Sequence, residues 1–277
     1  MRYAFRIVNV FVVDGDRLSG NPLCVFEDAR GMSDERMQAL ARQMNLSETT
    51  FVLPSERATA RVRIFTPAFE MPFAGHPTLG TAHVIGGDRV TLETKAGIVP
   101  VERAGDAWTL RAAKSPATRK VQASRAELAR MLGLPDDAID GEPLWVDTGS
   151  EQLVLPVASA ALVRAARPVP SLMAEHGFSD ARSEAMAYLW AREGDEIVAR
   201  FFFTQHGAVI EDPATGSACA NLGGYFVATG APLPLSARLR QGDAVGRPSK
   251  LGLRVEADGA IYVSGAVVDL GAGTFDL

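Results

Sequence analysis

Residues 211–226 read EDPATGSACANLGGYF, and they follow an apolar run at residues 197–203 that is typical of a strand. Pro213 favours the start of a helix, because the N–H group that proline lacks has no partner at the first helical position. The hydroxyl groups of Thr215 and Ser217 lie close to this start. The sequence therefore predicts a helix N-terminus whose free amide groups and positive dipole end can hold an anion.

The predicted helix is unusually rich in small residues, among them Gly216, Gly223 and Gly224. Each glycine costs about 1 kcal/mol of helix stability relative to alanine, so tertiary packing must hold the helix together. The same glycines let a ligand or another backbone approach closely. We therefore expect this helix to be buried.

A similar pattern occurs in the first half of the chain. Residues 77–82 (PTLGTA) and residues 213–218 (PATGSA) share the register P-x-x-G-(S/T)-A, each after a strand-like run. The Ser-Glu pair at residues 150–151 likewise repeats the pair at residues 47–48. Two ordinary helices of small residues could share this spacing by coincidence. The alternative, which we favour, is a duplicated chain whose two pseudo-symmetric lobes face a shared ligand.

Composition limits the possible functions. The chain has 277 residues, enough for two domains, and its 47% hydrophobic and 22% charged content is that of a globular protein. A net charge of −5 and the absence of a Lys/Arg block argue against a nucleic-acid surface, which leaves a small molecule as the expected partner. The longest apolar stretch, residues 153–163, is too short to span a bilayer. We expect no membrane partner and a cytoplasmic location.

Several further elements are predicted from local signals. Ser33 begins a helix with Met37 and Leu40 on its buried face, and Ser124 with Glu127 forms a capping box for another. The charged, alanine-rich segment 171–192 is expected to be mostly helical and exposed. Short strands are expected at 61–65, 90–94, 98–101 and 107–110.

Taken together, the motifs resemble those of the phenazine-biosynthesis PhzF-like family. Singly they are weak, but jointly they are specific and span nearly the whole chain in the family's order. They are Gly20-Asn21-Pro22, Ser47-Glu48-Thr49, residues 72–78, residues 211–218, and Gln241-Gly242 with residues 246–249.

This resemblance implies a mixed α/β (α+β) fold similar to diaminopimelate epimerase. It has two pseudo-symmetric lobes, each a curved, mostly antiparallel sheet or barrel around a central helix, with the active site in the cleft between them. The lobes are expected at residues 1–117 and 118–261, and the last strand, about residues 262–277, is expected to return to the first lobe.

The resemblance also implies an activity. The family's characterised member isomerises dihydro-hydroxyanthranilic acid in phenazine biosynthesis, so we expect a cofactor-independent, metal-free isomerase that transfers a proton at carbon. Its substrate would be a small cyclic or amino carboxylic acid, and the protein would be a homodimer. The catalytic residues would be Glu48, His76 and Asp212. The substrate-binding residues would be Gly75, Pro77, Thr78, Thr215, Gly216, Ser217, Gln241 and Gly242.

Each catalytic candidate also has an ordinary interpretation. Glu48 can be an exposed carboxylate in a loop, His76 can cap a helix that starts at Pro77, and Asp212 can be an N-cap. To remove a proton from carbon, a glutamate needs a pKa raised by burial from about 4.3 toward about 6–7. Catalysis therefore requires Glu48 to be enclosed.

Two other functions fit the same fold. Amino-acid racemases and epimerases of this fold use a thiol at each helix N-terminus, whereas Ala74 precedes Gly75-His76 here, and Asp212 or Pro213 takes the matching place. Cys24 and Cys219 lie elsewhere, so two-thiol chemistry is not expected, whereas epimerisation by a single carboxylate is not excluded. A catalytically silent protein that binds an acidic metabolite or a protein partner is the third possibility.

Overall fold

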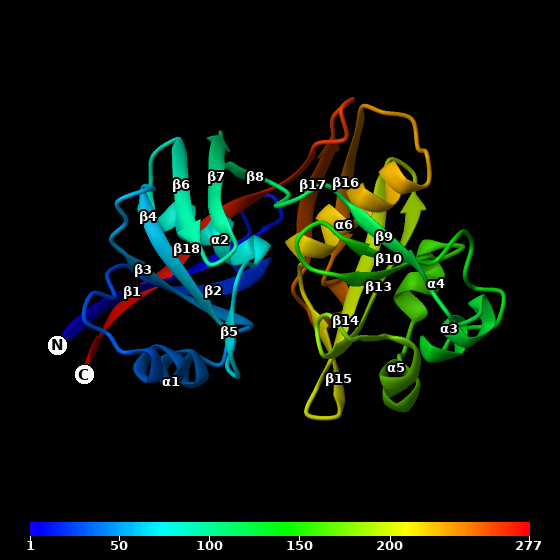
Figure 1. The fold of residues 1–277 in the computed structure, drawn as a ribbon, viewed down its shortest axis with the longest axis horizontal. Coiled ribbons are helices and arrows are strands. Elements are labelled where there is room, and N and C mark those ends of the chain that lie inside the picture. The colour runs from blue at the N-terminus through cyan, green and yellow to red at the C-terminus, as the bar shows by residue number, and fades with distance from the viewer. The chain divides into compact units, whose positions relative to one another are not determined.

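The computed structural model describes all 277 residues and divides them into two compact units. Unit 1 consists of Met1–Ala113 and Ser264–Leu277, and unit 2 of Lys114–Val263. Strands and helices mix in both units, which confirms the predicted α/β class (Figure 1).

Unit 1 is a closed barrel with a helix inside it. Its strands pair in the cyclic order β1-β2-β3-β4-β6-β7-β8-β18 and back to β1. Helix α2 contacts six of these strands and lies among them in Figure 1. The elements are β1 (Arg2–Val10), β2 (Asn21–Phe26), α1 (Asp34–Met44), β3 (Glu48–Leu53), β4 (Ala60–Phe65), β5 (Glu70–Met71), α2 (Gly75–Ile85), β6 (Arg89–Thr94), β7 (Gly97–Ala104), β8 (Ala107–Arg111) and β18 (Ile261–Asp276).

Unit 2 repeats this plan with a curved sheet ordered β9-β10-β11-β13-β14-β16-β17, against which α6 packs. The elements are β9 (Ala117–Lys120), α3 (Arg125–Met131), β10 (Leu144–Asp147), β11 (Gln152–Pro156), α4 (Ala160–Ala165), α5 (Pro170–His176), β12 (Phe178–Ser179), β13 (Glu184–Glu193), β14 (Glu196–Gln205), β15 (Ala208–Asp212), α6 (Gly216–Ala228), β16 (Leu235–Gln241), the 3₁₀ turn η1 (Asp243–Val245) and β17 (Ser249–Val255).

The two units share one sequence of strand pairings. From β18 in unit 1 and from β9 in unit 2, the pairs run antiparallel, antiparallel, parallel, antiparallel, parallel and antiparallel. In both units a short hairpin strand, β5 or β15, leads into the long helix, α2 or α6. The topology of the chain is therefore duplicated.

The hairpins define which residues correspond. Phe65 lies opposite Glu70 on β4 and β5, and Phe202 lies opposite Glu211 on β14 and β15. Counting forward from the two glutamates places Gly75, the first residue of α2, on Gly216, the first residue of α6. His76 therefore corresponds to Ser217, the second residue of α6.

This register corrects the sequence interpretation. The repeated motif is P-x-x-G, from Pro72 to Gly75 and from Pro213 to Gly216, and the alignment of Pro77 with Pro213 is wrong by five residues. Pro213 is not the first helical residue, because α6 begins at Gly216 with Thr215 as its N-cap.

The prediction that the charged segment 171–192 is mostly helical is wrong over most of that segment. Only α5, which ends at His176, is helical, and β13 occupies Glu184–Glu193. Residues 185–189 of that strand are buried, because β13 lies between β11 and β14 and its alanines face packed neighbours. The other local signals are confirmed: Ser33 caps α1, and Ser124 with Glu127 forms the capping box of α3.

Each hairpin is held by an arginine at the same position, which is buried in unit 2 and partly buried in unit 1. Arg63 donates two hydrogen bonds to Glu70 at 2.8 and 2.6 Å, and Arg200 donates two to Glu211 at 3.0 and 2.6 Å. Each guanidinium also lies over the phenylalanine two residues later on its own strand. Arg200 reaches further and donates to backbone carbonyls at the end of α4. The chain entering both long helices is therefore anchored by an ion pair.

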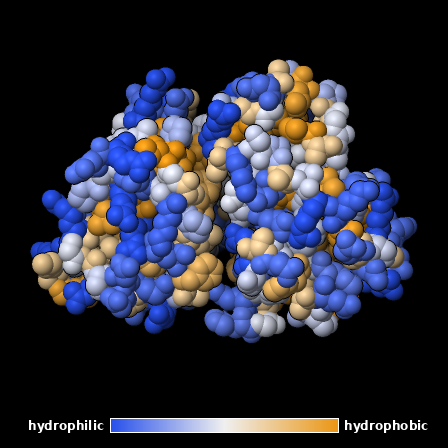
Figure 2. Space-filling model, in the orientation of Figure 1, coloured by the Kyte–Doolittle hydropathy of each residue, from blue (hydrophilic) through white to orange (hydrophobic).

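The face drawn in Figure 2 is mostly hydrophilic, with smaller hydrophobic areas between hydrophilic residues. None of the helices combines the length and hydropathy needed to cross a membrane.

We predict that Arg200→Met destabilises the protein by about 3–5 kcal/mol, because it leaves the Glu211 carboxylate, only 7% exposed, without its charged partner. Urea unfolding measures this loss. Arg89→Met, which breaks an exposed ion pair with Glu102, is the matched control and should change the unfolding free energy little. Equal losses in the two variants would show that the buried pair has no special role.

Candidate active site

The N-terminus of α2 is enclosed by unit 1. Its N-cap, Ala74, offers no side chain to the helix, and residues 74–78 are all buried. The hydroxyl group of Thr78 donates to the Ala74 carbonyl at 2.7 Å. The first amide groups of the helix are therefore not capped by a side chain.

Glu48 and His76 meet at this helix end. Glu48 is the first residue of β3, and its Oε2 lies 3.6 Å from Nε2 of His76, the second residue of α2. The side chains are only 15% and 5% exposed. The structure thus brings two predicted catalytic residues together and encloses the carboxylate, as removal of a proton from carbon requires.

The protonation state of His76 follows from its surroundings. Burial lowers the pKa of His76 from 6.5 to about 3, although a hydrogen bond to the Pro22 carbonyl acts in the opposite direction. Nε2 makes no hydrogen bond, so Nδ1 is the ring nitrogen that carries the proton and donates to Pro22. The ring is therefore neutral at physiological pH, and the lone pair of Nε2 is available to Glu48.

In unit 2, Gln241 organises the segment before α6. Its amide nitrogen donates to the Asp212 carbonyl at 2.9 Å and to the Thr215 hydroxyl at 3.0 Å, and that hydroxyl donates to the Asp212 carboxylate. Gly242 has φ 82°, and a Cβ there would lie 2.5 Å from the Pro213 carbonyl oxygen. The predicted binding residues Thr215, Gln241 and Gly242 thus hold Asp212 in place.

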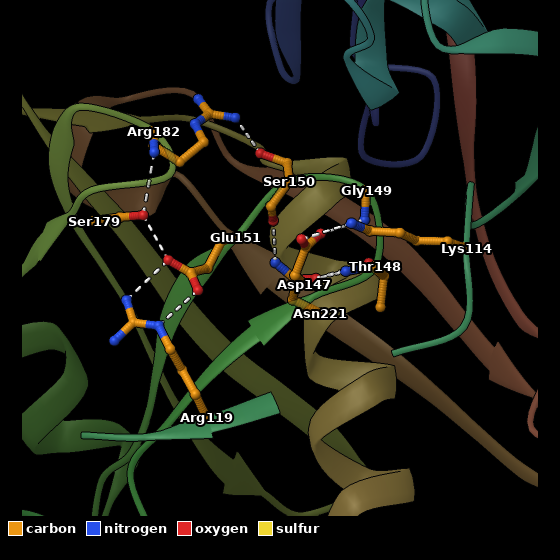
Figure 3. Close-up of polar contacts among 10 residues, drawn as sticks. All are labelled: Lys114, Arg119, Asp147, Thr148, Gly149, Ser150, Glu151, Ser179, Arg182 and Asn221. Atoms are coloured by element: carbon orange, nitrogen blue, oxygen red, sulfur yellow. Dashed lines mark hydrogen bonds and ion pairs between the residues drawn. The ribbon is translucent and has the colours of Figure 1, made fainter. Parts of the chain in front are cut away.

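Ser217 lies in the first turn of α6 and belongs to a buried polar chain. Its Oγ accepts a hydrogen bond from Nε2 of Gln152 at 2.9 Å, and Oε1 of Gln152 accepts one from Asn221 at 2.8 Å. Asn221 also contacts Thr148 and Ser150, as Figure 3 shows. The sequence interpretation missed Gln152 and Asn221, although a lone asparagine in a helix of small apolar residues was a visible signal.

The Ser-Glu pair at residues 150–151 is not a second copy of the catalytic pair. It immediately precedes β11, whereas Glu48 starts β3, whose counterpart is β13. Two hydrogen bonds from Arg119 and one from Ser179 lower the pKa of Glu151, although partial burial opposes them (Figure 3). The position that corresponds to Glu48 is Met186, since Thr49 and Ala187 lie opposite the matched phenylalanines of β4 and β14.

Thiols do not occupy the helix starts. The corresponding N-cap residues are Ala74 and Thr215, so the matching place in the second half is Thr215 rather than Asp212 or Pro213. Both cysteines are fully buried, and burial raises the pKa of Cys24 to about 12 and that of Cys219 further. Neither thiol is suited to proton transfer.

Comparison with known proteins gives consistent matches along the chain. Residues 9–273 match the family described as phenazine biosynthesis-like protein. An uncharacterized isomerase of Pasteurella multocida is 37% identical over 278 residues, covering 98% of this chain and 93% of its own. Trans-2,3-dihydro-3-hydroxyanthranilate isomerase of Pseudomonas aeruginosa is 37% identical over 275 residues, covering 94% of this chain and 95% of its own.

Solved structures share the fold. A Bacillus anthracis phenazine biosynthesis protein of the PhzF family matches all of both chains with a TM-score of 0.87 and 24% identity. A hydroxyproline epimerase of Agrobacterium vitis matches all of this chain and 93% of its own with a TM-score of 0.66 and 13% identity. The fold thus extends to enzymes with little sequence similarity.

The neutral state of His76 predicts how stability depends on pH. Because the folded pKa of about 3 lies below the unfolded value of 6.5, the unfolded chain binds the additional proton between these values. The contribution of His76 therefore destabilises the fold as pH falls from 6.5 toward 3. In His76→Gln this part of the acid sensitivity should vanish, as measured by urea unfolding across that range. Exposed His206→Gln is the control and should keep the wild-type slope.

Proposed function

This chain belongs to the phenazine biosynthesis-like protein family, and on that basis we propose that it is an isomerase that moves a proton between carbon atoms of a small carboxylic acid. Trans-2,3-dihydro-3-hydroxyanthranilate, the substrate in the name of a relative with 37% identity, is the first candidate. In this proposal the protein is a cytoplasmic homodimer, as expected from the sequence.

The contact between Glu48 and His76 is the observation that carries the proposal. A carboxylate that takes a proton from carbon becomes a carboxylic acid, which then needs a hydrogen-bond acceptor. Neutral Nε2 of His76, 3.6 Å from Oε2, is such an acceptor. A protonated histidine would instead favour the carboxylate and weaken it as a base. The pair is therefore suited to hold a proton in transit.

The proposed reaction needs no redox partner. Glu48 removes a proton from an activated ring carbon or α-carbon, and the electron pair moves into the conjugated system. The same glutamic acid then returns the proton to a different carbon, so that atoms and electrons balance. Such a reaction requires neither an oxidant nor a reductant, which is the reason for proposing cofactor-independent catalysis.

The remaining predicted residues keep their proposed roles. Asp212 is the third catalytic group, held by Thr215. Ser217 and the start of α6 bind the substrate carboxylate, because an uncapped helix N-terminus stabilises an anion by about 0.3–2 kcal/mol. Gly75 and Pro77 shape the start of α2 around His76.

Epimerisation of an amino acid is the second candidate, supported by the epimerase titles of structural neighbours. Its two-thiol form is disfavoured, since Ala74 and Thr215 stand at the N-caps and both cysteines are buried. A thiol-blocking reagent should therefore leave turnover unchanged. Epimerisation by one carboxylate would use the same Glu48.

We predict that Glu48→Gln lowers turnover by at least about 10²–10⁴-fold, since glutamine cannot accept the proton. Proton NMR in heavy water, with trans-2,3-dihydro-3-hydroxyanthranilate as substrate, follows isomerisation and deuterium incorporation together. Glu56→Gln, which changes an exposed glutamate shortly after β3, should react like the wild type.

A Glu48→Gln variant with near wild-type turnover would remove Glu48 from the mechanism. A wild-type protein that leaves this substrate unchanged would reject the substrate, and a panel of cyclic and α-amino acids would then be tested with the same readout. Deuterium exchange at one carbon without movement of the double bond would favour epimerisation.

A further inference from the structure

The buried polar chain next to Ser217 has a fixed direction. Asn221 accepts a hydrogen bond from the backbone N–H of Thr148 at 2.9 Å and donates to the backbone carbonyl of Ser150 at 2.7 Å (Figure 3). A backbone N–H can only donate and a backbone carbonyl can only accept, so the amide of Asn221 cannot be turned around. The orientation of Asn221 is therefore set by the main chain.

This orientation is passed on to Ser217. The second hydrogen of the Asn221 amide points to Oε1 of Gln152 at 2.8 Å, so Gln152 must present its NH₂ group to Ser217, 2.9 Å away. Oγ of Ser217 is thus an acceptor, and it donates to no group of the chain. Its hydroxyl proton remains available for a ligand at the first turn of α6.

Unit 1 shows that the fold itself does not require this polar chain. Counting from the helix starts, Gly80 corresponds to Asn221. The match of Thr49 with Ala187 also pairs Thr50 with Tyr188, which lie opposite Val25 and Val154. Two residues earlier on these strands, Leu23 therefore corresponds to Gln152. A Cβ on Gly80 would approach Leu23 to 2.6 Å, so unit 1 fills the same place with apolar atoms.

We infer that Asn221 and Gln152 are positioning residues that make Ser217 a hydrogen-bond donor to the carboxylate of the substrate. The side chains of Asn221 and Gln152 are 0% and 3% exposed, so they act through Ser217 and do not touch the ligand. This inference rests on the proposed function for the identity of the substrate, but not for the binding of a carboxylate.

A Ser217 hydroxyl that can only donate would select a ligand group that accepts hydrogen bonds. A carboxylate accepts hydrogen bonds only, and it suits both the Ser217 proton and the uncapped amide groups of α6. A carboxamide presents one donor and one acceptor and carries no charge. Correct orientation of Ser217 should therefore appear as selectivity for carboxylate over carboxamide.

Binding of anthranilate and of its uncharged analogue 2-aminobenzamide, followed by calorimetry, tests the inference without turnover. Ser217→Ala should weaken anthranilate binding by about 10- to 100-fold, the loss of a hydrogen bond to a charged group. Gln152→Met should weaken it by about 2- to 10-fold, since the hydroxyl is no longer oriented. Neither change should affect 2-aminobenzamide to the same extent.

A variant that carries both Gln152→Met and Ser217→Ala tests whether Gln152 affects binding through Ser217. If Gln152 acts through Ser217, Gln152→Met has no further effect in the Ser217→Ala background. Thr148→Val is the matched control, because it removes a hydroxyl bonded to Asn221 but keeps the backbone N–H that orients it. It should leave anthranilate binding unchanged. In turnover assays the Gln152 variant should raise KM and keep kcat.

Gln152→Glu serves if Gln152→Met does not fold. Its carboxylate would accept from Asn221 and also take the proton of Ser217, so anthranilate binding should fall at least as far as in Ser217→Ala. The inference is wrong if wild-type protein does not prefer anthranilate, or if the effects of Gln152→Met and Ser217→Ala simply add. If turnover is absent while the binding results hold, only the proposed function fails.

Discussion

The enclosure of a helix by strands is the constraint on which both units depend. Helices α2 and α6 pack against strands on several sides, so their residues must be small where the strands approach. A Cβ on Gly223 would lie 2.8 Å from Ile261, and one on Gly224 would lie 2.8 Å from Pro116. The start of α2 is buried and that of α6 is partly buried, and neither N-cap side chain bonds to the first amides. A helix N-terminus without a side-chain cap favours an anionic partner, because its amide groups and the positive end of its dipole face the ligand.

The duplicated frame carries different chemistry in its two halves. At the second helical residue, unit 1 has His76 and unit 2 has Ser217. At the matching position of β3 and β13, unit 1 has Glu48 and unit 2 has the apolar Met186. Imidazole and hydroxyl groups therefore occupy one pair of equivalent places, and a carboxylate and an apolar side chain occupy another. Duplication lets each place be adjusted separately, because a substitution in one copy does not disturb the packing of the other.

The sequence predicted the parts of this structure that depend on local signals. The caps at Ser33 and Ser124 depend on neighbouring residues, and the family motifs around Glu48 and His76 depend on their own short segments. The register of the repeat could not be predicted, since it depends on which residue of β4 or β14 lies opposite the hairpin glutamate. Strand β13 was missed because its alanines favour a helix and only its two neighbouring strands override that preference.

Within the candidate site too, the sequence predicted local features but not those that depend on long-range contacts. The identities of Glu48, His76 and Ser217 could be predicted from motifs, but the role of Gln152 depends on a contact across 65 residues. The neutral state of His76 depends on burial and on the Pro22 carbonyl, neither of which the sequence reveals. Long-range contacts therefore decide protonation and hydrogen-bond direction, while local sequence decides which groups are present.

The ion pairs of Arg63 and Arg200 are better explained by the geometry that they impose on the chain than by their contribution to stability. Replacing both members of such a pair with apolar residues of similar volume is often neutral or stabilising, so stability alone is weak grounds for keeping it. Arg63 with Glu70 and Arg200 with Glu211 recur at matched positions, and in each half the glutamate precedes the first helical residue by five positions. A bidentate arginine–carboxylate pair restricts the relative orientation of its two side chains as well as their distance. It therefore sets the path by which the chain enters α2 and α6, and with it the positions of His76 and Ser217.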